Sequence, residues 1–144
     1  MNRLRCLLLS FSFLWIFLWS IFGTLIASRI TTFAQTQVPL PKEEQWLIQL
    51  LTSAHSHMNV MSLLIGILGI SLPLLFPYFS LKILTRLSYG LVFSIILFGA
   101  GLLMEAFHFP FLQNSFFILV PASLGAVGFI LSVGIFGVLF FVAS

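Results

Sequence analysis

Three histidines and one glutamate are the residues of this sequence best suited to chemistry: His55, His57, His108 and Glu105. Imidazole nitrogens bind transition metals and haem iron, and a carboxylate beside an imidazole can carry a proton. Glu105 lies three residues before His108, so on a helix the two side chains share a face. The pattern leaves three chemistries open: a site for a Cu, Fe or Zn ion, a haem b held by two histidines, or a proton or quinone site.

The composition sets the environment in which such a site would work. The 144 residues include six basic and three acidic side chains, and 60% are hydrophobic. A soluble domain has roughly a quarter of its residues charged, so a cytosolic enzyme and a nucleic-acid-binding domain are excluded. One transmembrane domain over 1–144 is expected. The single cysteine, Cys6, excludes an intrachain disulfide.

Long uncharged stretches predict an all-α fold, a four-helix transmembrane bundle. A helix needs about 20 apolar residues to cross the hydrocarbon core. The stretches are continuously apolar, whereas the strands of a membrane barrel alternate. The predicted spans are 6–28, 58–77, 88–108 and 116–142. The first could instead be a signal peptide cleaved near 32–34, but its long apolar run, with Trp15 and Trp19, favours a retained helix.

Basic residues predict the orientation of the bundle. Four of them flank the first span or lie in the loop between the second and third spans: Arg3, Arg5, Lys82 and Arg86. Cytoplasmic loops are enriched in Lys and Arg, so we expect both termini to be cytoplasmic, in a bacterial-type inner membrane. The net positive charge therefore reflects topology and contact with anionic lipid. We expect no nucleic acid as a partner.

The region between the first two spans divides into two parts. Residues 30–40 are polar and predict a non-helical connector. Pro41 suits a first helical turn, and Glu43 and Glu44 suit a helix N-terminus. Because no helix breaker follows, 41–54 should be an amphipathic interfacial segment that extends the second helix outward.

Small residues at helical spacing predict the packing faces. They recur every three or four residues along one face and allow close approach of transmembrane backbones. The predicted packing residues are Ser62, Gly66, Gly69, Ser94, Gly101, Gly125, Gly128 and Ser132. The same topology places the polar candidates in one layer at the outer side: His55, His57, Asn59, Glu105 and His108.

The stretch Ala54-His55-Ser56-His57-Met58-Asn59 resembles the His-x-His-x-Asn segment of membrane proteins of the haem-copper oxidase and nitric-oxide reductase type. It also resembles a stretch in small, mostly uncharacterised four-helix membrane proteins. The resemblance implies His55 or His57 as an axial haem ligand, with Asn59 supporting the site. The chain has far fewer spans than those enzymes and lacks the further histidines of a copper centre. It would therefore be a reduced relative or an accessory subunit.

Three functions follow, and the chain is not expected to be a stand-alone enzyme. The first is a membrane subunit or assembly factor associated with respiratory-type electron transfer, holding haem b or a metal at the His/Glu layer. The second is a non-catalytic structural subunit that packs against a larger membrane complex or forms a homo-oligomer. The third is a proton or quinone site protein. His55 and His57 lie about 200° apart around a helix, so only one can face a shared site, and Glu105 could pair with His108, Arg29 or a partner subunit.

Overall fold

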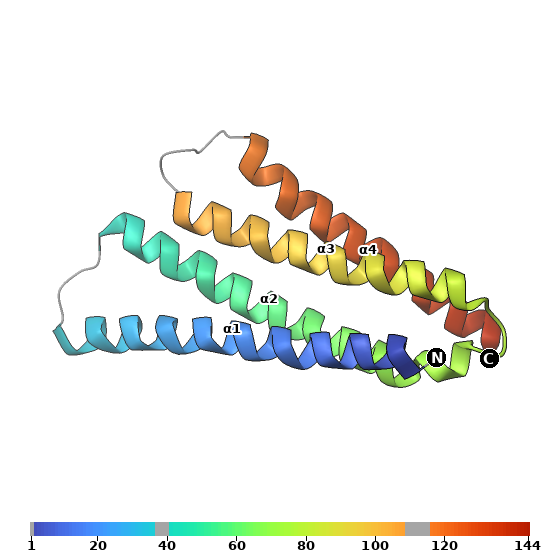
Figure 1. Cartoon of the computed structure of the whole chain (residues 1–144). Helices are drawn as coiled ribbons and strands as arrows, with labels where there is room; N and C mark the ends of the chain where they lie inside the picture. Colours follow the sequence, from blue (N-terminus) through green and yellow to red (C-terminus); the bar gives the residue numbers. More distant parts are fainter. Residues whose placement is uncertain (1, 37–40, 109–115) are drawn as a thin grey trace.

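The computed structural model describes residues 2–36, 41–108 and 116–144, and these form four long helices (Figure 1). The helices are α1 (Asn2–Thr36), α2 (Lys42–Ser71), α3 (Leu81–His108) and α4 (Phe116–Ala143), and a 3-10 turn, η1 (Leu72–Leu75), follows α2. Each long helix contains a segment long and apolar enough to cross a membrane. The predicted all-α four-helix transmembrane fold is therefore confirmed, and the fold is that of an integral membrane protein.

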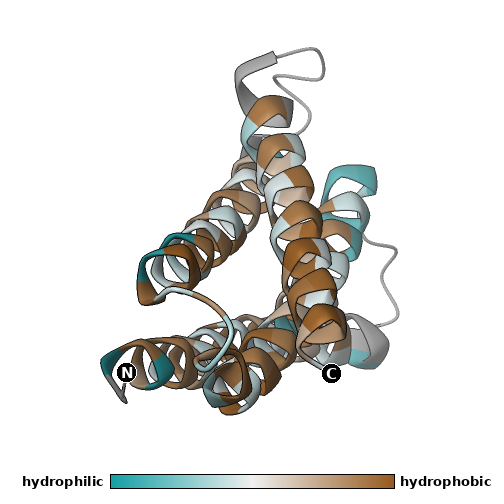
Figure 2. Ribbon diagram, turned by 90° about the vertical axis from the view of Figure 1, so that its right-hand side faces the viewer, coloured by the Kyte–Doolittle hydropathy of each residue, from teal (hydrophilic) through white to brown (hydrophobic). Residues whose placement is uncertain are grey.

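The helices form two antiparallel hairpins. α1 packs mainly on α2, α3 packs mainly on α4, and the hairpins meet chiefly through α2 and α3. α1 begins and α4 ends at the same end of the bundle, near η1 (Figure 1). In Figure 2 brown predominates along the helices, and teal hydrophilic segments mark helix ends such as the start of α1. This distribution fits helices whose middle parts lie in hydrocarbon and whose ends reach water.

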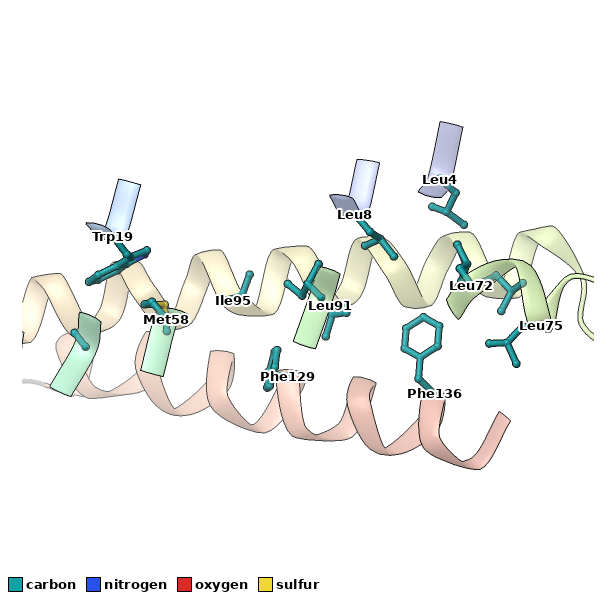
Figure 3. Close-up of a cluster of buried hydrophobic side chains, with 13 residues drawn as sticks. Leu4, Leu8, Trp19, Met58, Leu72, Leu75, Leu91, Ile95, Phe129 and Phe136 are labelled. Carbon is teal, nitrogen blue, oxygen red and sulfur yellow. The ribbon is translucent and has the colours of Figure 1, made fainter. Parts of the chain in front are cut away.

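A buried apolar cluster joins all four helices (Figure 3). Leu8 of α1, Met58 of α2, Leu91 of α3 and Phe136 of α4 are each fully buried within it. Leu72 of η1 lies in the same cluster. Lipid tails are as apolar as these side chains, so the cluster stabilises the bundle through close packing and dispersion contacts, with little contribution from the hydrophobic effect.

The structure corrects the predicted end of the first helix. Residues 30–36 were expected to be non-helical, but α1 continues through Thr36. The hydroxyls of Thr31 and Thr32 donate hydrogen bonds of 2.9 Å to the carbonyls of Ala27 and Ser28. Because these polar side chains are satisfied within the helix, they do not end it. Residues 37–40 lie outside the described residues.

The boundaries between the second and third spans also differ from the prediction. α2 is one continuous helix from Lys42, as expected, but it ends at Ser71. Pro73, which has no backbone N–H, occupies the first turn of η1. Lys82 and Arg86 were expected in a loop and instead lie in the first turns of α3. α3 begins early because the Ser80 hydroxyl accepts a hydrogen bond of 3.4 Å from the Ile83 N–H, as an N-cap does.

Candidate functional site

His55 links the two helices of the first hairpin. Its Nδ1 lies 2.6 Å from the carbonyl oxygen of Trp19 on α1, and its Nε2 lies 3.2 Å from the amide nitrogen of Asn59. A carbonyl oxygen only accepts hydrogen bonds, so Nδ1 carries the proton and donates it to Trp19. Nε2 then accepts from the Asn59 amide, which fixes the orientation of that amide. Both nitrogens of a neutral imidazole are therefore used within the hairpin.

Gly23 provides the space for the His55 ring. A Cβ atom at this position would lie 2.6 Å from Cε1 and 2.9 Å from Nε2 of His55. Any larger residue would push the ring away from α1, because real Cβ atoms do not approach other heavy atoms so closely. Trp19 and Gly23 are four residues apart and share a face of α1. No pattern within α1 or α2 connects them with His55, because such a pattern does not fix how the two helices align.

His57 has a different environment from His55. Its Nδ1 lies 2.7 Å from the carbonyl oxygen of Ser53, one turn earlier in the same helix, and 3.4 Å from the Ser53 hydroxyl oxygen. The side chain is exposed. His55 therefore contacts α1, while His57 bonds only within α2 among the described residues.

Glu105 lies on α3, one turn before the end of that helix. Its side chain is half-buried, and none of the described residues forms a hydrogen bond or ion pair with it. Arg29, one of its expected partners, instead pairs with Glu44 at 3.5 Å. His108 ends α3, but its side chain lies outside the described residues. The Glu105–His108 contact thus stays a prediction.

The described side chains do not converge on a metal site. Among the described side chains, which do not include that of His108, no group of three or more His, Cys, Asp or Glu is close enough to hold an ion. A haem ligand needs a free lone pair on a ring nitrogen, and the lone pair of His55 is directed at Asn59. His55 therefore has no free nitrogen for a haem in this arrangement. Nε2 of His57 bonds to none of the described residues, so the axial ligand that the resemblance implies stays a prediction.

Small residues of the first hairpin lie at the contact between α1 and α2. The Ser12 hydroxyl donates a buried hydrogen bond of 2.7 Å to the carbonyl oxygen of Ser62. A Cβ at Gly66 would lie 2.8 Å from the Ser12 hydroxyl oxygen, and one at Gly69 would lie 3.1 Å from Leu8. α1 and α2 therefore approach closely in the part of the hairpin that lies between His55 and η1.

The second hairpin packs even more closely. A Cβ at Gly101 would overlap the backbone of Ala122, and one at Gly125 would overlap the backbone of Phe98. A Cβ at Gly128 would lie 2.5 Å from the hydroxyl oxygen of Ser94. Two hydroxyls are satisfied one turn back in their own helices, those of Ser94 and Ser132. Backbone-to-backbone contact at these glycines holds α3 against α4.

A groove of about 590 Å³ runs beside the His55–Asn59 pair on the surface of the first hairpin. Ser20 and Thr24 of α1 and Thr52 of α2 line it together with these two residues. The hydroxyls of Ser20, Thr24 and Thr52 donate to carbonyls of their own helices. These three hydroxyls are thus satisfied, whereas the Oδ1 of Asn59 is buried without a hydrogen-bond partner among the described residues. No family model matches the chain, and no curated protein or solved structure is significantly similar to it.

Proposed function

We propose that the protein is a non-catalytic membrane subunit that packs against a larger membrane protein complex. The observation that carries this proposal is the closed hydrogen bonding of His55, whose two ring nitrogens contact Trp19 and Asn59. This polar contact between α1 and α2 therefore serves the hairpin itself. A reactive or ligand-binding histidine would need at least one free nitrogen.

The outer face of α4 is the surface that we propose for this packing. Among the described elements, α4 packs chiefly on α3 and more lightly on η1. Gly134 and Gly137 face open space, with no heavy atom within 4 Å of an added Cβ. Val138 and Phe141 beside them are exposed. Small residues next to large apolar ones let another transmembrane helix approach closely, so a helix of a partner subunit fits this face.

Glu105 provides independent support for a partner. A carboxylate at membrane depth costs about 2.5–3.5 kcal/mol on insertion scales and is normally paired or functional. None of the described residues pairs with Glu105. A basic or hydrogen-bonding side chain of a neighbouring subunit would satisfy it.

Purification of the full-length protein from its native membranes in a mild detergent tests the proposal. The expected result is a colourless protein without stoichiometric metal that elutes with a larger complex. Gly137→Leu should weaken this association, because it fills the open space on α4. Gly90→Leu is the matched control, since Gly90 also faces open space but lies on α3. Elution of the wild-type protein alone would contradict the proposal.

The same preparation separates the competing functions. A Soret band or bound Cu, Fe or Zn that is lost in His108→Ala would favour the electron-transfer subunit with haem b or metal. A quinone that copurifies in stoichiometric amount and is lost in Glu105→Gln would favour the proton or quinone site. Either result would replace the structural role by a chemical one.

We also propose that both termini face the cytoplasm of a bacterial-type inner membrane. Arg3 and Arg5 lie at the start of α1, and Lys82 and Arg86 lie at the start of α3. These positions are at the end of the bundle where α1 begins and α4 ends. A single cysteine at the C-terminus, Ser144→Cys with Cys6→Ser, should react with a membrane-impermeant maleimide in inverted vesicles. Labelling in intact cells would reverse the orientation.

A further inference from the structure

A cavity of about 580 Å³ lies between α1, α2 and the end of α3. Its volume is within the range of roughly 300–1,000 Å³ typical of small-molecule sites. Most of its wall is apolar and includes Phe22, Leu25, Leu47, Leu51 and Phe107. It lies toward the start of α2, where α1 and α2 separate (Figure 1). This end of the bundle is opposite to the one where α1 begins.

The rim of the cavity is charged. Arg29 of α1 and Glu43 and Glu44 of α2 all line it. Arg29 and Glu44 form a long ion pair of 3.5 Å, and the Arg29 side chain is 73% exposed. Glu43 is exposed in the first turn of α2. The rim therefore offers one guanidinium and two carboxylates at the entrance to an apolar chamber.

We propose that this cavity binds a phospholipid of the bilayer with a zwitterionic phosphoethanolamine headgroup. The acyl chain would lie among the apolar side chains, at the depth where α1 and α2 cross hydrocarbon. The phosphate would contact Arg29, whose planar guanidinium donates paired hydrogen bonds to phosphate oxygens. The primary ammonium would donate hydrogen bonds to Glu43 and Glu44.

The arrangement of charges selects this headgroup over other lipids. A phosphoglycerol headgroup supplies an anion for Arg29 but brings no cation to the two carboxylates. A phosphocholine headgroup supplies a cation that cannot donate N–H hydrogen bonds. A quinone supplies neither charge. Of these four molecules, only the lipid with phosphoethanolamine satisfies both the guanidinium and the carboxylates by charge-assisted hydrogen bonds.

Native mass spectrometry of the delipidated full-length protein tests the proposal. Four ligands are added in separate experiments: dioleoyl phosphatidylethanolamine, phosphatidylcholine, phosphatidylglycerol and decylubiquinone. The fraction of protein that carries one bound molecule is measured for each. The phosphatidylethanolamine adduct should be the most abundant. Glu43→Gln, which alters an exposed side chain, should weaken it roughly 2- to 5-fold, the factor that corresponds to loss of an exposed ion pair. Arg29→Gln should remove the preference for phospholipid over quinone.

A filled cavity provides the second test. Leu47→Trp places an indole in the cavity and should abolish the adduct. Leu63→Trp is the matched control on the same helix, because Leu63 is 57% exposed and does not line the cavity. Equal adducts in these two variants would overturn the proposal, as would a preference for phosphatidylglycerol or quinone in the wild-type protein. The Glu43→Gln result decides the matter if Leu47→Trp does not fold.

Discussion

Gly23→Ala is the substitution that most sharply tests how the first hairpin is held together. The new Cβ would lie 2.6 Å from Cε1 of the His55 ring. The ring cannot move away from α1 without lengthening the 2.6 Å contact between its Nδ1 and the Trp19 carbonyl. One added methyl group should therefore break the hydrogen bond between the two helices.

The expected loss of stability combines three terms. Overpacking by one methyl group costs about 1–3 kcal/mol. An interhelical hydrogen bond in a membrane protein contributes about 0.6 kcal/mol on average and about 1.7 kcal/mol at most. Alanine favours a helix over glycine by up to about 1 kcal/mol. The net prediction is a loss of about 2 kcal/mol in the free energy of unfolding, equivalent to roughly a 30-fold change in the equilibrium constant.

Denaturant-induced unfolding in mixed micelles, followed by circular dichroism, measures this loss. Gly90→Ala is the matched control, because a Cβ at Gly90 meets nothing within 4 Å. The same Gly23→Ala change in a His55→Ala background should cost much less, since the clashing ring is absent. A loss no larger than that of Gly90→Ala, or an equal loss in both backgrounds, would refute the proposed contact.

Two further predictions compare residues that look alike in the sequence. His55→Ala should lower the free energy of unfolding by about 1–3 kcal/mol, because it removes the hydrogen bond and leaves a space. His57→Ala should lie within about 0.5 kcal/mol of wild type, as exposed substitutions usually do. Thermal unfolding in detergent distinguishes the two, and equal effects would contradict the different environments of the rings. Gly125→Ala should destabilise more than Gly23→Ala, because its Cβ overlaps the rigid backbone of Phe98, whereas Gly134→Ala should be neutral or stabilising. Unfolding in the same micelles measures both, and a well-tolerated Gly125→Ala would show that α3 and α4 are not in backbone contact.

The fold was largely predictable because hydropathy encodes it directly. Charged residues are so rare that the apolar runs between them define the spans, and Pro41 followed by acidic residues indicated where α2 begins. One error concerns polar residues whose hydrogen bonds are local, and another concerns a proline. Thr31 and Thr32 appeared to belong to a connector, but their hydroxyls bond back to the helix. Pro73 lies in a predicted span, yet α2 ends just before it.

The candidate site was less predictable because it depends on how helices align. The spacing of His55 and His57 indicated that only one could face a given site, but not which one. Gly23 decides this for the α1 side, since it makes room for the His55 ring. The alignment of Gly23 with His55 follows from the packing of two antiparallel helices, which a pattern within either helix does not specify.

The nitrogen-15 NMR spectrum of histidine-labelled protein tests the central claim most directly, namely that His55 closes the α1–α2 hairpin with both ring nitrogens. His55→Ala identifies the signals by their loss. We expect an imidazole with its proton on Nδ1, unchanged when haemin or Zn²⁺ is added to the purified protein. A His55 ring with the proton on Nε2, or one whose nitrogen signals shift or broaden on addition of haemin or Zn²⁺, would contradict it.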